Sequence, residues 1–358
     1  MIPAARPLVG DDERKAVDAV LASGGLAQGP QVAAFEQEFA AIVESRRCVA
    51  VNSGTSALHM ALIALGVRSG DEVIVPSFTF AATANAVRLA GGTPVFVDID
   101  ERTFCMDPAA VLAALTPRTR VLMPVHLYGH PADMTRLGAI ADQHGLLILE
   151  DAAQAHAAQW EGRSVGAWGD AAAFSFYPTK NMTSGEGGMV TTGSADVART
   201  VQLLRNQGME TRYHNEIVGF NTRMSDIHAA IGRVQLQKLP GWTATRQENA
   251  SWLTEHLEGV ITPYVDDRAV HVYHQYTIRV PGHDRDAFVA ALAERGVGSG
   301  VYYPVPVHAL PSFGMQLDLP ATAAAAAEVV SLPVHPALSA QDRETIAQAV
   351  NEVAKAGA

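Results

Sequence analysis

One lysine of the chain lies in a setting that suits imine chemistry. The segment 174–188 reads FSFYPTKNMTSGEGG, which places Lys180 after an expected buried strand, past a proline and before a glycine-rich turn. A lysine that forms an imine needs a fixed position and a lowered pKa. The other lysines lie among charges, at the end of an amphipathic helix or in the tail: Lys15, Lys238 and Lys355. Lys180 is therefore the candidate nucleophile, against the alternative of an ordinary loop lysine.

A carboxylate that suits the same chemistry lies upstream. Asp151, in the segment LLILEDAAQ at 146–154, directly follows an expected buried strand. Open α/β sheets place ligand contacts at such strand ends. A lysine-bound cofactor with a pyridine ring, such as pyridoxal phosphate (PLP), needs a carboxylate against the ring nitrogen, so that the ring stays protonated and takes up electrons. Asp151 fits that role, and the alternative is an aspartate that caps a helix.

A third element could hold a phosphate. The segment Asn52-Ser53-Gly54-Thr55-Ser56 joins an expected strand to the start of an expected helix. Free backbone N–H groups and hydroxyls at a helix N-terminus attract anions. The alternative is a plain Ser or Thr cap. The chain contains neither GxGxxG nor GxxxxGK[ST], so the sequence supports no dinucleotide fingerprint and no Walker site.

A framework of alternating strands and helices must position these residues. In the first half we expect strands at 47–51, 72–75, 94–99, 120–125 and 146–150, and helices at 54–66, 79–90 and 132–144. This alternation predicts the α/β class, with a mostly parallel sheet covered by helices. The runs VLMPV and LLIL are apolar throughout, as in strands that are buried on both faces.

The pattern changes in the second half. Short strands are expected at 171–176 and 188–192, followed by helices at 224–239 and 242–257 that Pro240-Gly241 separates. A smaller α+β unit follows, with a strand at 272–280 and helices at 284–295, 321–330 and 340–354. We therefore predict two domains, residues 1–240 and residues 241–358.

The bulk composition bounds the functional class. The formal net charge of −11 gives no long-range attraction to nucleic acid or to an anionic membrane. The two cysteines, Cys48 and Cys105, form no metal-ligand spacing, and we expect no metal site and two reduced thiols. No apolar run is long enough for a membrane helix, and no signal peptide is apparent. The expected location is the cytoplasm.

Several segments, taken in order, resemble the DegT/StrS sugar aminotransferases. They are NSGTSALHMAL, PSFTFAATANAV, EDAAQAHAA, SFYPTKNMTSGEGG and VGFNTRMSDIHAAIGRVQLQKL. The resemblance covers about residues 29–336 and implies PLP fold type I. That fold has a large domain with a mostly parallel mixed sheet covered by helices, and a smaller C-terminal α+β domain.

The resemblance also implies the residues that hold the cofactor. Lys180 would be the Schiff-base lysine, Asp151 would pair with the pyridine nitrogen, and Gln154 would contact the ring hydroxyl. The remaining implied contacts are Gly54, Thr55 and Ser175 on the phosphate, Phe80 stacked on the ring, and Asn221 on the phosphate of the neighbouring subunit. Phe80 has the alternative of a core phenylalanine, and Asn221 that of a turn residue or helix cap. The contribution of Asn221 implies a homodimer.

The resemblance also implies contacts with the substrate. The stretch from Tyr303 to His308 resembles the sugar-facing loop of the family, and Arg212 is a further candidate or else a solvated arginine. In AQAHAA, Ala157 stands where the family often has glycine, and His156 is assigned a structural role. Dehydratases of the family carry histidine at the lysine position, so Lys180 favours transamination.

The predicted reaction transfers an amino group from L-glutamate or L-glutamine to a keto sugar. A nucleotide-linked 3-keto or 4-keto hexose is the expected acceptor class in amino-sugar biosynthesis. Open alternatives are a keto-cyclitol aminotransferase, a PLP-dependent sugar dehydratase or lyase, and a non-catalytic PLP-binding regulator. The regulator lacks support because no effector domain is apparent in the chain.

Overall fold

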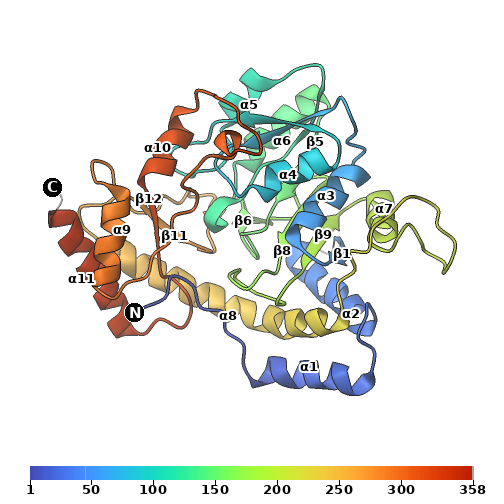
Figure 1. Ribbon diagram of the computed structural model, residues 1–358, viewed down its shortest axis with the longest axis horizontal. Coiled ribbons are helices and arrows are strands. Elements are labelled where there is room, and N and C mark those ends of the chain that lie inside the picture. Colours follow the sequence, from blue (N-terminus) through green and yellow to red (C-terminus); the bar gives the residue numbers. More distant parts are fainter. Residues whose placement is uncertain (45, 357–358) are drawn as a thin grey trace.

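The centre of the protein is a seven-stranded sheet with helices around it (Figure 1). The computed structural model describes residues 1–44 and 46–356. The strands are β1 (Arg47–Val51), β2 (Glu72–Pro76), β3 (Thr93–Val97), β4 (Thr119–Leu122), β5 (Leu147–Asp151), β8 (Ala171–Ser175) and β9 (Gly188–Thr192). Their order is β1-β9-β8-β5-β4-β2-β3. All neighbours are parallel except β9, which is antiparallel to both β1 and β8. The predicted mostly parallel mixed sheet is confirmed.

Helices cover both faces of this sheet. They are α2 (Pro30–Phe39), α3 (Gly54–Ala64), α4 (Ala82–Leu89), α5 (Pro108–Ala114), α6 (Met134–His144) and α7 (Ala195–Arg205). Val49 and Leu149 pack with α3, α4 and α7 in one core, whereas their neighbours Ala50 and Ile148 belong to cores on the other face. This alternation is the period of two that a strand imposes on its side chains. The strands and helices expected in the first half are confirmed, with bounds shifted by a few residues.

The prediction of a helix break at Pro240-Gly241 was wrong. A single helix, α8, runs from Asp226 to His256 with Pro240 inside it. A proline in a helix interior costs about 3 kcal/mol, yet both halves of α8 are held by packing. The first half lies on α1 (Asp11–Ser23) and α2, and α8 also contacts α11 (Ala340–Ala356). Pro240 itself is exposed, so its ring meets solvent on the outer face of the helix.

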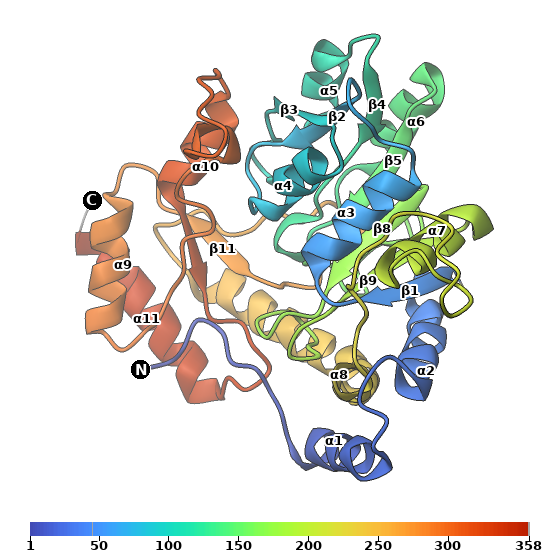
Figure 2. The same ribbon diagram turned by 45° about the vertical axis from the view of Figure 1, so that its right-hand side comes forward.

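The C-terminal part is an α+β unit beside the sheet (Figure 2). Strand β11 (Tyr276–Arg279) pairs antiparallel with β12 (Val329–Leu332), and α9 (Arg285–Glu294), α10 (Pro320–Glu328) and α11 complete the unit. The expected helix at 321–330 therefore ends early, because Val329 and Val330 pair with β11 in a strand. The expected strand at 272–280 shortens to four residues.

The protein also has a minor sheet, and its N-terminal segment contacts the C-terminal unit. Strands β6 (Gln159–Trp160), β7 (Arg163–Ser164) and β10 (Ala269–Val270) form a small sheet in the order β10-β6-β7. Ile2 of the N-terminal segment forms a bridge with Val297, so the chain begins against the C-terminal unit. The division at residue 240 stays a prediction, and that residue lies inside α8. Within the described residues, no helix is long and apolar enough to cross a membrane.

Candidate active site

The predicted chemical residues come from strand ends that share one edge of the sheet. Asp151 is the last residue of β5, Lys180 lies in the loop after β8, and Gly54 begins α3 just after β1. Strands β1, β5 and β8 run in the same direction, because β9 is antiparallel to both of its neighbours. Their carboxyl ends therefore meet at the edge where open α/β sheets bind ligands.

Asp151 is a buried carboxylate held by hydrogen bonds. Its Oδ2 accepts a hydrogen bond of 2.8 Å from the Thr83 hydroxyl, and its Oδ1 accepts one of 3.2 Å from the Ala153 N–H. Burial raises the pKa of Asp151, while the bonds from Thr83 and Ala153 and the charge of Lys180 oppose that rise. The residues directly after Asp151 form turns and not a helix, which excludes the alternative of a helix cap.

Thr83 was missed at the sequence level. It lies in α4, fully inside the protein, and its hydroxyl also contacts that of Thr79 at 3.0 Å. The only signal was the run of small and hydroxyl residues in PSFTFAATANAV. Threonine in a helix usually satisfies its own turn, so this side chain could be assigned to Asp151 only from the tertiary structure.

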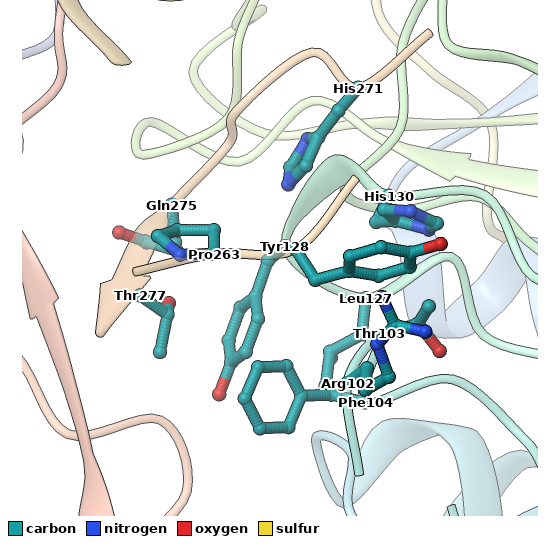
Figure 3. A pocket seen from close by; sticks show the side chains of 11 residues that line it. Arg102, Thr103, Phe104, Leu127, Tyr128, His130, Pro263, His271, Gln275 and Thr277 are labelled. Carbon is teal, nitrogen blue, oxygen red and sulfur yellow. The ribbon is translucent and has the colours of Figure 1, made fainter. Parts of the chain in front are cut away.

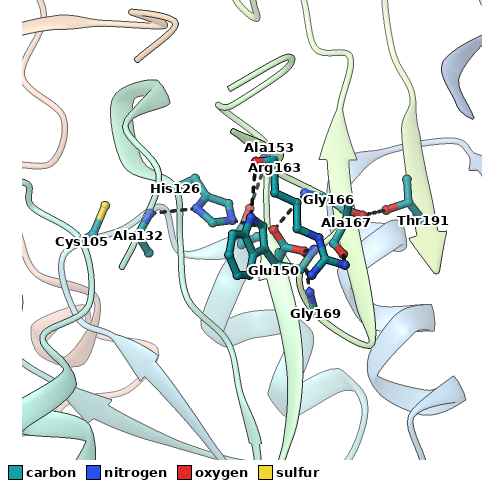
Figure 4. Close-up of polar contacts among 12 residues, drawn as sticks. Cys105, His126, Ala132, Glu150, Ala153, Arg163, Gly166, Ala167, Gly169 and Thr191 are labelled. Atoms are coloured by element: carbon teal, nitrogen blue, oxygen red, sulfur yellow. Dashed lines mark hydrogen bonds and ion pairs between the residues drawn. The ribbon is translucent and has the colours of Figure 1, made fainter. Parts of the chain in front are cut away.

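Glu150, the residue before Asp151, anchors the strand end through its polar contacts (Figure 4). Its carboxylate accepts hydrogen bonds from the backbone N–H groups of Gly166, Trp168 and Gly169 at 2.8 to 2.9 Å, and His126 Nε2 lies 3.1 Å away. Burial raises the pKa of Glu150, but these partners outweigh it and hold the pKa below the usual value. Because neighbours on a strand face opposite sides, fixing Glu150 also fixes the direction of Asp151.

Gln154 is fixed at both ends of its amide. Its Oε1 accepts a hydrogen bond of 2.7 Å from the Tyr128 N–H, and its Nε2 donates one of 3.1 Å to the Tyr303 hydroxyl. The Tyr128 ring lies beside Phe104 in a small cavity (Figure 3), and its hydroxyl donates to the Tyr302 carbonyl. Tyr303 thereby joins the C-terminal part of the chain to the residues that follow β5.

At the expected phosphate site, the start of α3 lies close to the end of β8. A Cβ at Gly54 would lie 2.7 Å from the Cβ of Ser175, so only glycine allows α3 to start this close to the end of β8. Ser53 caps α3 by accepting a hydrogen bond of 3.1 Å from the Ser56 N–H. The turn 52–56 thus leaves helix N–H groups and the hydroxyls of Thr55 and Ser175 at the same sheet edge, which suits an anion.

Lys180 is held in a partly buried loop. Its backbone N–H donates to the Tyr177 carbonyl at 2.9 Å. Burial lowers the pKa of its amine to about 8, and the negative charge of Asp151 opposes that shift. Near pH 8, a larger fraction of this amine is therefore neutral than in an exposed lysine. The neutral amine is the form that can act as a nucleophile or base.

His156 lies beneath this loop, between the rings of Phe174 and Phe176. Burial and the charge of Lys180 lower its pKa to about 3, so the ring is neutral. The next residue, Ala157, has a φ of 65°. That left-handed conformation favours glycine, which agrees with the glycine expected at this position from the resemblance.

Phe80 and Tyr303 lie close together, whereas His308 points elsewhere. Phe80 is 58% exposed, which excludes a core phenylalanine, and its ring centroid lies 5.9 Å from that of Tyr303. His308 instead turns into the protein, where its Nδ1 lies 2.6 Å from the Ser77 hydroxyl. The structure thus brings Tyr303 to the other predicted residues and makes His308 an anchor of the loop that carries it.

The segment 206–223 carries the last two candidates. Arg212 is exposed, with its guanidinium 4.8 Å above the Tyr213 ring. Asn221 is also exposed and does not cap α8, since Ser225 does so. The Asn52 N–H donates to the Thr222 carbonyl at 2.9 Å, so this segment passes beside the turn expected to hold phosphate.

Metal-binding clusters are absent from residues 1–44 and 46–356. Both cysteines are free and buried, and burial raises the pKa of each thiol to about 12, so neither is a reactive thiolate.

Comparison with known proteins gives consistent results over the whole chain. Residues 7–351 match the DegT/DnrJ/EryC1/StrS aminotransferase family. A UDP-N-acetyl-3-dehydro-α-D-glucosamine 3-aminotransferase of Acidithiobacillus ferrooxidans is 41% identical over 95% of this chain and 93% of its own. A dTDP-3-amino-3,4,6-trideoxy-α-D-glucose transaminase of Streptomyces venezuelae is 42% identical over 95% and 91%. A pleiotropic regulatory protein of Geobacillus stearothermophilus is 41% identical over 94% and 93%.

Solved structures agree with these relatives. DesV of S. venezuelae, solved with a ketimine intermediate, has a TM-score of 0.93 and 42% identity, over 96% of this chain and 95% of its own. Spr1654 of Streptococcus pneumoniae in its PLP form has a TM-score of 0.95 and 27% identity, over 100% of this chain and 99% of its own.

Proposed function

The chain belongs to the DegT/DnrJ/EryC1/StrS aminotransferase family, and from that premise we propose which residues carry the amino transfer and which substrates take part. The enzyme is a PLP-dependent sugar aminotransferase that acts in amino-sugar biosynthesis. The observation that carries the residue assignment is the convergence of Lys180, Asp151 and the Gly54–Ser175 contact at one sheet edge.

The residues at this edge suit PLP. Asp151 is a buried carboxylate whose pKa burial raises, so its negative charge is favoured only beside a positive group. At the turn, a Cβ on Gly54 would clash with the Ser175 side chain, so glycine lets the N-terminus of α3 and the Ser175 hydroxyl lie side by side. Asp151 would hold the protonated ring nitrogen, Gln154 the ring hydroxyl, and Gly54, Thr55 and Ser175 the phosphate. When bound, the cofactor supplies an electrophilic carbon and an electron sink.

Lys180 has two tasks in this proposal. It would anchor the cofactor through Nζ, and after displacement by the donor's amine the free Nζ would accept the proton of the donor's α-carbon. In the second half of the reaction the same Nζ returns a proton to the sugar carbon that becomes amine-bearing. A lysine whose pKa is lowered to about 8 can serve both directions near neutrality.

Phe80 and Tyr303, whose ring centroids lie 5.9 Å apart, would enclose the ring of the cofactor. Phe80 would cover the cofactor, and its exposure leaves its face free for that contact. Tyr303, held by Gln154, would face the sugar. Arg212 and His308 are weaker candidates, since Arg212 stands in solvent and His308 is bonded to Ser77.

The proposed donor is L-glutamate or L-glutamine, and the proposed acceptor is a nucleotide-linked 3-keto or 4-keto hexose. One site must serve both substrates in turn, so the kinetics are expected to be ping-pong. The test is a panel of keto sugars presented to the enzyme that donor alone has converted to the amine form. Return of the original absorbance with a nucleotide-linked hexose supports the assignment, whereas a response to keto-cyclitols alone overturns it.

The same assay separates the other reaction types. A dehydratase, a lyase or a binding protein without catalysis would not convert to the amine form with donor alone. Wild-type enzyme that binds PLP but gives no such conversion with L-glutamate, L-glutamine or other amino acids would therefore contradict the assignment of this chain to transamination.

We further propose that the active unit is a homodimer in the cytoplasm, with each site completed by Asn221 of the other chain. Asn221 is exposed and caps no helix, which leaves its amide free for such a contact. A helix cap would have been the ordinary use of an asparagine at that place. A C2 dimer uses one patch twice and builds two sites together.

Subunit mixing tests this arrangement. In a mixed dimer of Lys180→Ala and Asn221→Ala chains, one site carries both changes and the other carries neither. Activity is expected to recover toward half of wild type. If Asn221 acted on its own chain's site, every site would keep one lesion and mixing would restore nothing. Cell fractionation checks the location.

A further inference from the structure

A buried arginine without a counter-ion lies close to Lys180. Arg246, in the second half of α8, is only 7% exposed. One of its terminal nitrogens donates to the Tyr273 carbonyl at 3.1 Å, while its Nε has no hydrogen-bond partner. No ion pair joins it to a carboxylate anywhere in the part of the chain that the structure describes.

This charge needs a partner. A guanidinium stays protonated in proteins, and an isolated charge taken out of water is strongly disfavoured. Burial alone lowers the pKa of Arg246 to about 10, with no contribution from an acidic neighbour. In other buried arginines of the chain the partner is present: Arg205, for example, forms an ion pair with Glu36. An anion from outside the chain would complete Arg246 in the same way.

Arg246 faces a cavity that also includes the reactive lysine. The cavity has a volume of about 20 Å³, enough for one water-sized group. Arg6, Lys180 and Arg246 supply its charges, and no carboxylate lines it. Glu13, which bonds Gln235 of the lining, is already shared with Lys238. The cavity is therefore a cationic site within a chain of net charge −11.

One hydrogen-bond acceptor in the wall of the cavity has no donor. Asn181 lies in its wall, and the amide nitrogen of this side chain donates to the Val272 carbonyl at 2.9 Å. Its Oδ1 is buried with no partner. A simple anion would neutralise Arg246 but leave this oxygen unsatisfied. A ligand that presents both a carboxylate and an N–H group would satisfy both residues.

We propose that this cavity binds the α-carboxylate of the amino donor, with Arg246 as its principal partner. The inference rests on the proposed function and adds a place for the donor. An α-amino acid carries its amine and its carboxylate on the same carbon. A carboxylate held in a cavity with Lys180 as one wall therefore brings the amine next to the lysine that it must displace. The proposal requires the displaced Lys180 side chain to leave the cavity wall, because the cavity of about 20 Å³ is smaller than a carboxylate.

Arg246→Gln and Arg246→Lys test the proposal in the PLP-loaded enzyme. The readouts are the single-turnover rates with L-glutamate and with methoxyamine, which displaces the lysine but has no carboxylate. We expect the single-turnover rate at low L-glutamate concentration to fall about 100-fold in Arg246→Gln and less in Arg246→Lys, while the methoxyamine rate changes less than threefold. Equal loss with both reagents, or full activity with L-glutamate, overturns the proposal.

The matched control is Arg343→Gln. Arg343 also has a buried Nε without a partner, but it lies in α11 and pairs with the exposed Glu248. Its loss is expected to leave both rates unchanged. Arg6→Gln should have a smaller effect than Arg246→Gln, because Arg6 is exposed to solvent.

A measurement on wild type keeps the test decisive if Arg246→Gln fails to fold. Acetate is expected to compete with L-glutamate but not with methoxyamine, and to change the fluorescence of Trp242, which lines the cavity. Acetate that slows both reagents alike and leaves the fluorescence unchanged contradicts the carboxylate site. Absence of any reaction with L-glutamate or L-glutamine, with the acetate effect on fluorescence intact, would instead contradict the proposed function.

Discussion

The two sides of the site differ in how completely their polar atoms are bonded. On the Asp151 side, both oxygens of Asp151, both ends of Gln154 and both oxygens of Glu150 have partners within the chain. On the Lys180 side, buried atoms of His156, Asn181, Arg246 and His274 have none. We call these the bonded side and the open side.

The difference separates two tasks. A group that must hold one direction throughout the reaction benefits from a complete set of partners, as Asp151 does through Thr83 and through its neighbour Glu150. A group that must exchange ligands cannot be fully bonded beforehand, because each bond would have to break when the substrate binds. We infer that the bonded side keeps the geometry and that the open side receives the reactants.

The largest effect is expected on the open side. Lys180→Ala should reduce turnover by at least about 10⁴-fold, because both the anchoring amine and the proton carrier are lost. Borohydride reduction of the PLP-loaded wild type, followed by peptide mapping, should label Lys180. Label on Lys238, which pairs with Glu13 and Asp12, would contradict the assignment. Lys238→Ala is the control and should retain turnover.

A smaller effect is expected on the bonded side. Asp151→Asn keeps the shape and the bond from Thr83 but cannot sustain a positive charge on the ring nitrogen. We expect a loss of about 10²- to 10³-fold in rate, with part of the cofactor still bound. Unchanged rates in this variant would reduce Asp151 to a structural residue and would remove the functional contrast between the two sides.

The lowered pKa of Lys180 predicts a pH dependence. The rate at which apoenzyme takes up PLP should depend on the neutral amine, so it should fall about tenfold per pH unit below pH 8 and level off above. An exposed lysine would level off only near the ordinary lysine pKa of 10.5. Stopped-flow absorbance between pH 6 and pH 10 measures this profile. Because Asp151 opposes the shift, Asp151→Asn should move the midpoint to lower pH.

Glu150 tests the bonded side through stability. Glu150→Gln removes the charge that accepts bonds from three N–H groups and His126, and should lower the free energy of unfolding by about 2–4 kcal/mol. The pKa of Glu150 is lowered in the folded protein, so its contribution is present above the ordinary glutamate value of 4.5 and is lost as pH falls through the folded pKa. The gap between wild type and variant should therefore shrink in acid.

Denaturant unfolding at several pH values measures that gap. Glu248→Gln, which changes an exposed partner of Arg343, is the control and should alter stability by less than about 1 kcal/mol. A gap that stays constant down to acid pH would mean that the charge of Glu150 does not stabilise the strand end.

The smallest effect is expected at Ala157. Ala157→Gly relieves the left-handed φ of 65° but increases the freedom of the unfolded chain. The net gain should be about 0.5 kcal/mol in the free energy of unfolding. Ala139→Gly, on the exposed face of α6, should instead destabilise by about 0.5–1 kcal/mol. Equal signs in the two variants would contradict strain at Ala157.

The local features of this protein follow from short segments of its sequence. The period of hydrophobic residues predicted most strands and helices of the large sheet, and the motifs around Lys180, Asp151 and Gly54 placed each residue at a strand end. These properties depend on neighbours within a few positions in the chain, so they can be read from one sequence. The resemblance supplied the roles, which residue types alone left open.

Contacts between side chains that are distant in the sequence could be established only from the folded arrangement. The continuity of α8 through Pro240 depends on packing against α1, α2 and α11, which outweighs the local preference for a break. The hydrogen bond from Thr83 to Asp151 and the contact of His308 with Ser77 join residues that are far apart in the sequence. The cavity that Arg246 shares with Lys180 also brings distant segments together. No local pattern encodes such pairs, because their energies arise from burial and from the partners that folding brings together.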